Sequence, residues 1–218
     1  MNPDFVGLRT KMVDGQVRTT DVTDTRILDA MGLVPRELFV EPARASLAYI
    51  DEDLPLGGGR FLMEPSPFAK LIQLLSLRSS DRVLVVGCAT GYSLAVLAGI
   101  AGEVIGLESD KALVAKASET VGSLGLANAR VVEGPLEKGL PNEAPFDAIF
   151  VEGAIETLPD ALLAQLADGG RLTTVEGLGN AGVARLYTMA DGAAAGRRGF
   201  NAAVKPLPGF ELRPVFQF

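Results

Sequence analysis

The sequence predicts an α/β fold, a doubly wound and mostly parallel sheet with antiparallel C-terminal strands and an N-terminal helical extension. From Arg82 onward, apolar segments of strand length alternate with segments of helical periodicity. These strands are apolar throughout, which is typical of a parallel sheet buried on both faces. The first 65 residues lack this alternation. We therefore expect two parts, an extension with a substrate-side loop over 1–65 and a Rossmann-like domain over 66–218.

The composition is that of a folded, acidic domain. The chain has 218 residues, of which 48% are hydrophobic and 22% charged, with a net charge of −7. It has no block of Lys and Arg, so nucleic acid is not an expected partner. Its apolar runs are shorter than the roughly 18 residues of a membrane span, and its start does not resemble a signal peptide. We expect a cytoplasmic protein without a membrane partner, either a monomer or a homodimer.

The absence of histidine limits the possible chemistry. With His 0 in the composition, Ser-His, Cys-His and His-metal mechanisms are excluded. No cluster of residues is typical of a zinc site, and no metal is expected. Cys88 is the single cysteine, so an internal disulfide is also excluded. Any proton transfer would use carboxylates, Lys, Tyr, Cys or water.

The segment before Arg82 shows helix and loop signals. The residues T-D-T-R supply a helix cap, and apolar residues follow at helical spacing. A later stretch is rich in Gly and Pro and favours a loop. The elements expected here are helices over 23–31, ended by Gly32, and from Pro35, a loop over 51–65, and a helix over 67–77 capped by Ser66.

The segment from Arg82 shows the alternating pattern. The expected strands are 82–86, 104–108, 129–133, 147–151 and 171–175, and the expected helices are 92–101, 110–124 and 159–166. Asp168-Gly169-Gly170 is expected to form a turn. In the tail, 183–189 and 210–216 are expected to add antiparallel strands, and 190–199 to form a mobile loop.

Residues Arg82 to Asp110 predict a β-α-β unit that holds an adenosine ligand. A glycine turn follows the first strand, with Gly87 and Gly91 four positions apart. A dinucleotide site requires G-x-G-x-x-G, and Ala89 stands at the middle position, so that fingerprint is incomplete. A turn of this shape that ends in Gly-Tyr resembles S-adenosylmethionine sites. S-adenosyl-L-methionine is therefore the predicted cofactor.

Glu108 is the principal candidate for binding this cofactor. It closes the second strand roughly 20 residues after the turn, where its carboxylate can accept hydrogen bonds from both ribose hydroxyls. The alternative is a solvated acid at a strand end. The glycines could be ordinary turn residues, and Cys88 either a reactive thiol or a small residue that fills the turn. The other candidate cofactor-binding residues are Gly87, Cys88, Gly91, Tyr92, Ser109, Glu133 and Gly134.

Four motifs in order resemble the protein-L-isoaspartate O-methyltransferase family. They are V-P-R-E-L-F-V at 34–40, A-Y-I-D-E-D-L-P-L-G-G-G at 48–59, the glycine turn, and A-P-F-D-A-I-F-V-E-G-A at 144–154. The resemblance implies the methyltransferase type of the fold. It also implies transfer of a methyl group from S-adenosylmethionine to the α-carboxylate of an isoaspartyl residue. The substrates would be damaged proteins, which are repaired when the ester collapses to a succinimide.

The chain departs from the family pattern on the acceptor side. Met63 stands where the family has a serine near the accepting carboxylate, and a thioether cannot donate a hydrogen bond. Ser66 could substitute, although a helix cap explains it. Glu152 follows the strand where such folds keep residues that face the transferred methyl group; it could equally be a loop acid. Met63 and Glu152 are thus the candidate catalytic positions.

The cofactor turn departs as well. Val85 replaces an acid of the family, and Ala89 places a methyl group where the backbone should approach the ligand. Arg36 and Arg60 could pair with a substrate carboxylate, although a surface or structural ion pair is favoured for each. These departures leave open a relative that acts on another acceptor or serves as a non-catalytic binding scaffold. A nicotinamide-dependent oxidoreductase is disfavoured by the glycine spacing.

Overall fold

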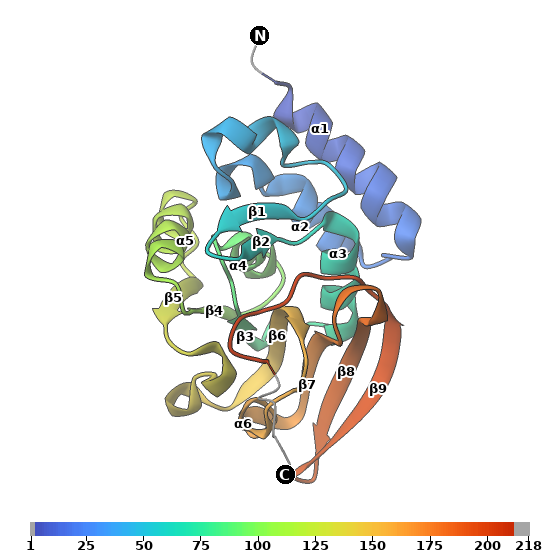
Figure 1. The fold of residues 1–218 in the computed structure, drawn as a ribbon, viewed down its shortest axis with the longest axis vertical. Coiled ribbons are helices and arrows are strands. Elements are labelled where there is room, and N and C mark those ends of the chain that lie inside the picture. The colour runs from blue at the N-terminus through green and yellow to red at the C-terminus, as the bar shows by residue number, and fades with distance from the viewer. Residues whose placement is uncertain (1–2, 212–218) are drawn as a thin grey trace, which may run out of the picture.

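A seven-stranded sheet organises residues 3–211, the part of the chain that the computed structural model describes (Figure 1). The strands are β3 (Arg82–Val86), β4 (Glu103–Glu108), β5 (Ala129–Glu133), β6 (Phe146–Ile155), β7 (Leu166–Glu176), β8 (Val183–Ala190) and β9 (Ala193–Asn201). Their order is β5-β4-β3-β6-β7-β8-β9. The first five in this order are parallel, and β8 and β9 are antiparallel. The predicted fold class is confirmed.

Helices cover both faces of the sheet because its strands are apolar on both sides. Val83 and Val85 contribute to one core cluster, and Leu84 and Val86, which point the other way, contribute to a second. The first cluster includes α3 (Pro65–Leu75), α4 (Tyr92–Ala98) and α5 (Lys111–Ser123). The second includes Leu162 of α6 (Asp160–Leu163). This two-sided burial explains why hardly any polar residue interrupts the parallel strands.

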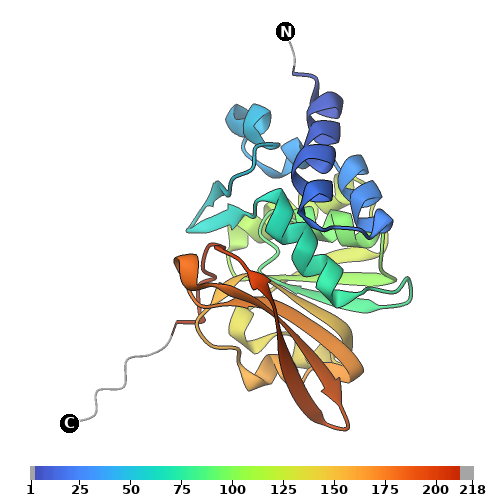
Figure 2. The same ribbon diagram turned by 90° about the vertical axis from the view of Figure 1, so that its right-hand side faces the viewer.

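The N-terminal extension packs against the first of these clusters. It comprises α1 (Phe5–Met12), α2 (Thr25–Leu33), short helical turns over 13–20, 36–39 and 42–47, and a hairpin of β1 (Leu54–Gly57) and β2 (Arg60–Leu62). Met12, Ile27 and Phe39 are buried in one cluster with Val85 of the sheet. Figures 1 and 2 both place the hairpin between the helices of the extension and the sheet. The division at residue 65 stays a prediction.

Two predicted loops are wrong, because both contain hairpin turns. Residues 51–65 include the β1–β2 hairpin, whose turn uses Gly57, Gly58 and Gly59, all at positive φ. Residues 190–199 include most of β9, which pairs with β8 through Asp191-Gly192, both also at positive φ. An Asp-Gly pair is a strong hairpin signal, and the small residues around it obscured the strand.

Several predicted boundaries also need correction. Helix α2 begins at Thr25 with Asp24 as its cap and continues through Gly32 to Leu33. Helix α3 begins at Pro65, so Ser66 lies inside it and does not cap it; its hydroxyl donates to Thr20 Oγ1. Residues 168–170 lie within β7. The remaining helices are shorter than predicted, and most of the strand predicted over 210–216 lies outside the described residues.

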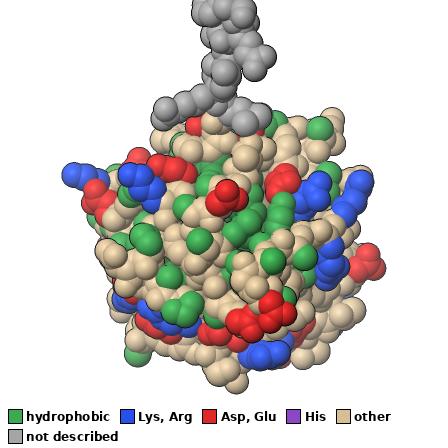
Figure 3. All heavy atoms as spheres, turned by 90° about the horizontal axis from the view of Figure 1, so that it is seen from below, with side chains coloured by type: hydrophobic (Ala, Val, Ile, Leu, Met, Phe, Trp, Pro, Cys, Tyr) green, Lys and Arg blue, Asp and Glu red, His purple; other side chains and the backbone are tan. Residues whose placement is uncertain are grey.

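The surface shows no single-signed charge on the face seen from below in Figure 3. Acidic and basic side chains are interspersed there around a strip of hydrophobic side chains. Across residues 3–211, every helix is either too short or too polar to cross a bilayer.

Candidate cofactor and acceptor site

The glycine turn joins β3 to α4 in the conformation that its residues permit. Gly87, Ala89 and Gly91 all have positive φ, of 84°, 47° and 91°. The amides of Gly87 and Cys88 donate to Leu107 O at 2.8 and 3.2 Å, which ties the turn to β4. A Cβ on Gly91 would lie 3.3 Å from Ala117 Cβ of α5, so this glycine also permits close helix packing.

Glu108 lies at the carboxyl end of β4 and is fully buried. Its Oε2 accepts from Ala89 N at 2.9 Å, and its Oε1 accepts from Ser109 N at 2.8 Å and Asp110 N at 3.1 Å. It is therefore not the solvated acid that the sequence left open. Because several backbone amides hold the carboxylate at the edge of the turn, its orientation is fixed.

The charged partner of Glu108 is Arg60, which reaches it from β2. Arg60 Nη1 lies 2.7 and 2.8 Å from the two carboxylate oxygens, and its Nη2 donates to Gly87 O at 2.7 Å. Only 4% of the Arg60 side chain is exposed. Arg60 thus forms a buried structural ion pair. It bridges the two features, acid and turn, that the sequence assigned to the cofactor.

Leu207 covers the same turn from the C-terminal side. A Cβ placed on Gly87 would lie 2.8 Å from Leu207 Cδ2, and one placed on Gly153 would overlap Leu207 Cγ. The backbone around Leu207 is held on β6: Leu207 N donates to Ala154 O at 2.8 Å, and Ala154 N donates to Lys205 O at 2.9 Å. The space in front of both glycines is therefore filled by a side chain of the protein itself.

The acceptor side contains Glu152 and Met63. Both line a small cavity of about 10 Å³, and both are buried. Ser93 Oγ donates to Glu152 Oε2 at 2.5 Å. Burial raises the pKa of Glu152 to about 7, although the Ser93 hydrogen bond and the Arg60 charge act in the opposite direction. Glu152 is thus a buried acid that titrates near neutrality, not an ordinary loop acid.

Arg36 supports this acceptor side without an acidic partner among the described residues. Its Nε donates to Ala48 O at 2.7 Å and its Nη2 to Met63 O at 2.6 Å. Its guanidinium lies 4.7 Å from the centre of the Tyr92 ring. That ring also packs against Phe39, with centroids 5.3 Å apart. The Tyr92 ring therefore faces the extension, and only its backbone lies at the turn.

The other candidate residues have less direct positions. Cys88 is buried, and burial raises the pKa of its thiol well above the usual value, which favours the interpretation as a turn filler. Glu133 is about half exposed and lies 3.8 Å from Lys111 Nζ. Gly134 N donates to Glu108 O at 3.0 Å. The cofactor roles of these residues and of Ser109 stay predictions.

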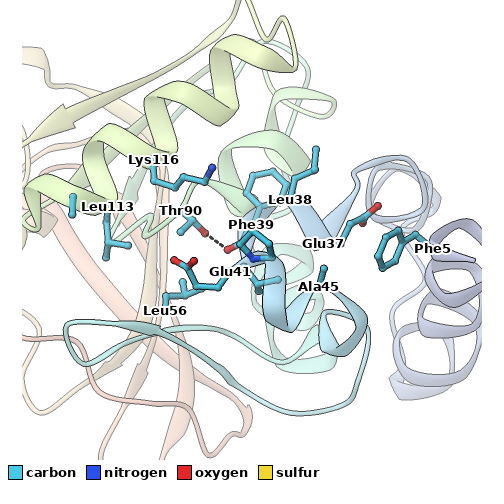
Figure 4. Close-up of a pocket in the computed structure, with 13 residues that line it drawn as sticks. Phe5, Glu37, Leu38, Phe39, Glu41, Ala45, Leu56, Thr90, Leu113 and Lys116 are labelled. Atoms are coloured by element: carbon cyan, nitrogen blue, oxygen red, sulfur yellow. Dashed lines mark hydrogen bonds between the residues drawn. The ribbon is translucent and has the colours of Figure 1, made fainter. Parts of the chain in front are cut away.

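An open groove of about 550 Å³ lies beside this site (Figure 4). Leu113 and Lys116 of α5 form one wall, and residues 37–42 with Leu56 form the others. At its base Thr90 Oγ1 donates to Phe39 O at 2.8 Å, which links the turn to the extension. Neither Arg60 nor Glu108 lines this groove.

The chain matches the family described as protein-L-isoaspartate(D-aspartate) O-methyltransferase over residues 9–196. It belongs to this family. The resemblance seen in the four motifs is thereby confirmed. A protein-L-isoaspartate O-methyltransferase 2 of Anaeromyxobacter sp. is 44% identical over 169 residues, which cover 78% of this chain and 70% of that protein. A protein-L-isoaspartate O-methyltransferase of Methylorubrum extorquens is 44% identical over 171 residues, which cover 78% and 74%.

Solved structures agree with this assignment. A protein-L-isoaspartate O-methyltransferase superposes with a TM-score of 0.80 at 27% identity, covering 92% of this chain and 66% of that chain. A Plasmodium falciparum structure described under the same enzyme name, in complex with S-adenosyl-L-homocysteine, superposes with a TM-score of 0.77 over 91% and 97% of the two chains. At 22% identity the latter shows the fold alone. The family is S-adenosylmethionine-dependent, as the glycine turn predicts.

The positions of Glu108 and the glycine turn fit that cofactor, but Arg60 and Leu207 fill the space that it would occupy. Glu108 and the glycine turn have the positions expected of a ribose acid and a close-approach turn. The lone pairs of Glu108 are already taken by Arg60 and the backbone amides, and Leu207 covers Gly87. S-adenosylmethionine does not fit the site in this conformation.

Sequence reasoning missed the ion pair between Arg60 and Glu108, the position of Leu207, and the hydrogen bond from Ser93 to Glu152. Arg60 and Glu108 are 48 positions apart, and Leu207 comes from the tail. No spacing rule links such residues. The available signal was the arginine directly after three turn glycines in a motif that borders the site.

Proposed function

We propose that this protein is an S-adenosylmethionine-dependent methyltransferase whose acceptor is the carboxylate of L-isoaspartyl residues in damaged proteins. The observation that carries this proposal is Glu108, a carboxylate held by backbone amides at the end of β4 and beside the glycine turn. Family membership and relatives at 44% identity support the same reaction. A cytoplasmic location, no nucleic-acid partner, and a monomer or homodimer complete the proposal.

The replacement of the family serine by Met63 is compatible with this reaction. A carboxylate is already an anionic nucleophile, so methyl transfer to it depends mainly on placing the two reactants in line. The lost hydroxyl would supply one or two hydrogen bonds in the transition state, worth on the order of 10²–10³-fold in rate. We therefore expect a slow enzyme, with Met63→Ser faster than the wild type.

The test is a pair of measurements on the full chain. Calorimetric titration with S-adenosylhomocysteine reports the cofactor site directly. Methyl transfer from labelled S-adenosylmethionine is then measured on an isoaspartyl peptide and on the same peptide with normal aspartate. We expect cofactor binding and labelling of the isoaspartyl peptide alone. Labelling of neither peptide by a chain that binds the cofactor would exclude the isoaspartyl acceptor.

A second function, a non-catalytic binding scaffold, is favoured by the ion pair of Arg60 with Glu108. This contact neutralises the acid that the cofactor would use and occupies its oxygens with a side chain of the protein itself. The scaffold hypothesis requires that S-adenosylhomocysteine give neither heat nor a thermal shift at millimolar concentration. It also requires the same result when Arg60 and Leu207 are replaced.

A further inference from the structure

Two side chains from distant parts of the sequence meet in front of the glycine turn. Arg60 arrives from β2 in the extension, and Leu207 arrives from the segment that follows β9. A Cβ on Gly87 would lie 2.9 Å from Arg60 Nη2 and 2.8 Å from Leu207 Cδ2. Both side chains therefore pack against Gly87, at the carboxyl end of β3.

Arg60 competes for the same acceptor atoms as a ribose. An ionised carboxylate has about four lone-pair sites. In Glu108 these sites accept from Arg60 Nη1, which bridges both oxygens, and from the amides of Ala89, Ser109 and Asp110. Two ribose hydroxyls can bind this carboxylate side by side only after the guanidinium has left.

Leu207 obstructs the backbone face of the turn. Gly87 and Gly153 lie at the carboxyl ends of the neighbouring strands β3 and β6, and Leu207 packs on both. In open α/β sheets, ligands bind outside these strand ends. The cavity that remains beside Leu207 measures about 10 Å³, roughly the minimum for a single water molecule and far too small for a nucleoside.

Both obstructing side chains lie on weakly anchored backbone. Strand β2 has three residues and, within the described part of the chain, pairs with β1 alone, across a turn of three glycines. The segment of Leu207 is attached to β6 by two backbone hydrogen bonds at Ala154 and has no other strand pairing among residues 3–211. Short segments with few backbone hydrogen bonds open at low free-energy cost.

We propose that Arg60 and Leu207 form an intramolecular latch that closes the cofactor site, and that cofactor binding requires both side chains to withdraw. This inference rests on the proposed function. A ligand that binds only the open state has an apparent affinity reduced by the fraction of open molecules. Weakening the latch should therefore tighten cofactor binding, whereas replacing an ordinary structural residue should leave it unchanged.

The experiment compares cofactor affinity between latch variants and matched controls. The latch variants are Leu207→Ala, Arg60→Gln and the double variant. Leu28→Ala removes an equally buried leucine of α2, and Arg18→Gln removes an exposed arginine with the same change of charge. S-adenosylhomocysteine is the probe, titrated by calorimetry, and circular dichroism verifies the fold of each variant. Leu207→Ala alone carries the test if Arg60→Gln does not fold.

We expect each single latch variant to bind S-adenosylhomocysteine at least fivefold more tightly than the wild type, and the double variant more tightly still. The controls should change the affinity by less than twofold. Equal or weaker binding by the latch variants, with measurable binding by the wild type, overturns the latch and leaves the proposed function intact. Absence of binding in every folded variant up to millimolar ligand overturns both.

Discussion

Arg36 and Arg60 are two buried arginines of the same N-terminal segment, and they are neutralised in different ways. Arg60 bridges both oxygens of Glu108. Arg36, which is fully buried, donates to the carbonyls of Ala48 and Met63 and lies over the Tyr92 ring. Its Nη1 has no hydrogen-bond partner within residues 3–211. The guanidinium of Arg60 is held by a carboxylate, whereas that of Arg36 is held by two carbonyl dipoles and the face of an aromatic ring.

This difference gives Arg36 a structural role, whereas Arg60 obstructs the cofactor site. Arg36 ties two loop carbonyls together, and burial lowers the pKa of its guanidinium although Tyr92 and the charge of Glu152 act in the opposite direction. Arg60 also joins two segments, but it does so through an acid that the fold offers to a ligand. A buried arginine therefore indicates function through its partner and not through its burial. The predictions below test this contrast, from the largest expected effect to the smallest.

Arg60→Ala should have the largest effect on stability. It leaves Glu108 buried without its counter-charge, which costs about 3–5 kcal/mol in the free energy of unfolding. Urea denaturation measures this loss. The double variant Arg60→Met with Glu108→Gln removes both charges, keeps an acceptor oxygen for the backbone amides, and should recover part of the stability. If the double variant is no more stable than Arg60→Ala, the ion pair is not what the single substitution breaks.

Glu152 should make stability depend on pH, because burial raises its pKa although the charges of both arginines act in the opposite direction. Its pKa is raised from 4.5 to about 7, so between these values the folded state binds more protons than the unfolded state. Its contribution, up to about 3 kcal/mol, is complete below pH 4.5 and is lost as the pH rises to 7. The free energy of unfolding of the wild type should therefore fall, relative to that of Glu152→Gln, between pH 5 and pH 7. Denaturation curves of both proteins at the two pH values measure this difference. Parallel pH profiles of the two proteins would contradict the raised pKa.

Arg36→Lys should cost less than Arg60→Ala, about 2 kcal/mol. Lysine keeps the positive charge, but its ammonium cannot reach both carbonyl oxygens in the fork geometry of a guanidinium. Thermal unfolding monitored by circular dichroism measures the loss. Cofactor affinity should not change by more than twofold, in contrast to Arg60→Gln. A similar gain in affinity for Arg36→Lys would remove the distinction between the two arginines.

Arg18→Gln should have the smallest effect, below about 0.5 kcal/mol, because its ion pair with Asp14 is exposed to solvent. The same denaturation measurement applies. This exposed pair sets the scale for an arginine whose charge is already compensated by water. A loss above 1 kcal/mol here would show that charge removal alone, and not burial, accounts for the effect of Arg60→Ala.

Local sequence patterns were sufficient to predict an element where its residues favour a single kind of secondary structure. Arg82–Val86 and Ala129–Glu133 were both predicted to the residue. The first is a nearly fully buried apolar run, which is typical of a strand covered on both faces. The second is an edge strand with partly exposed residues, and its position in the β-α-β alternation predicted it. The hairpin at 54–62 and the second strand of the hairpin at 183–201 were missed where small residues left no periodicity, whereas the strand at 183–189 was predicted. Asp24 and Asp110 each stand directly before the first residue of a helix, and the side chain of each accepts from backbone amides of the first turn.

The sequence by itself determined the parallel sheet, the glycine turn, the acid at the end of β4 and, through four motifs, the family. Each of these depends on contacts between residues that are close in the chain, or on burial that leaves a period in the sequence. Only the tertiary structure decided that Arg60 and Leu207 meet at Gly87 and that Glu108 is paired. These contacts join segments that lie far apart in the chain. Such long-range pairing leaves no local pattern, because packing, not periodicity, brings its partners together.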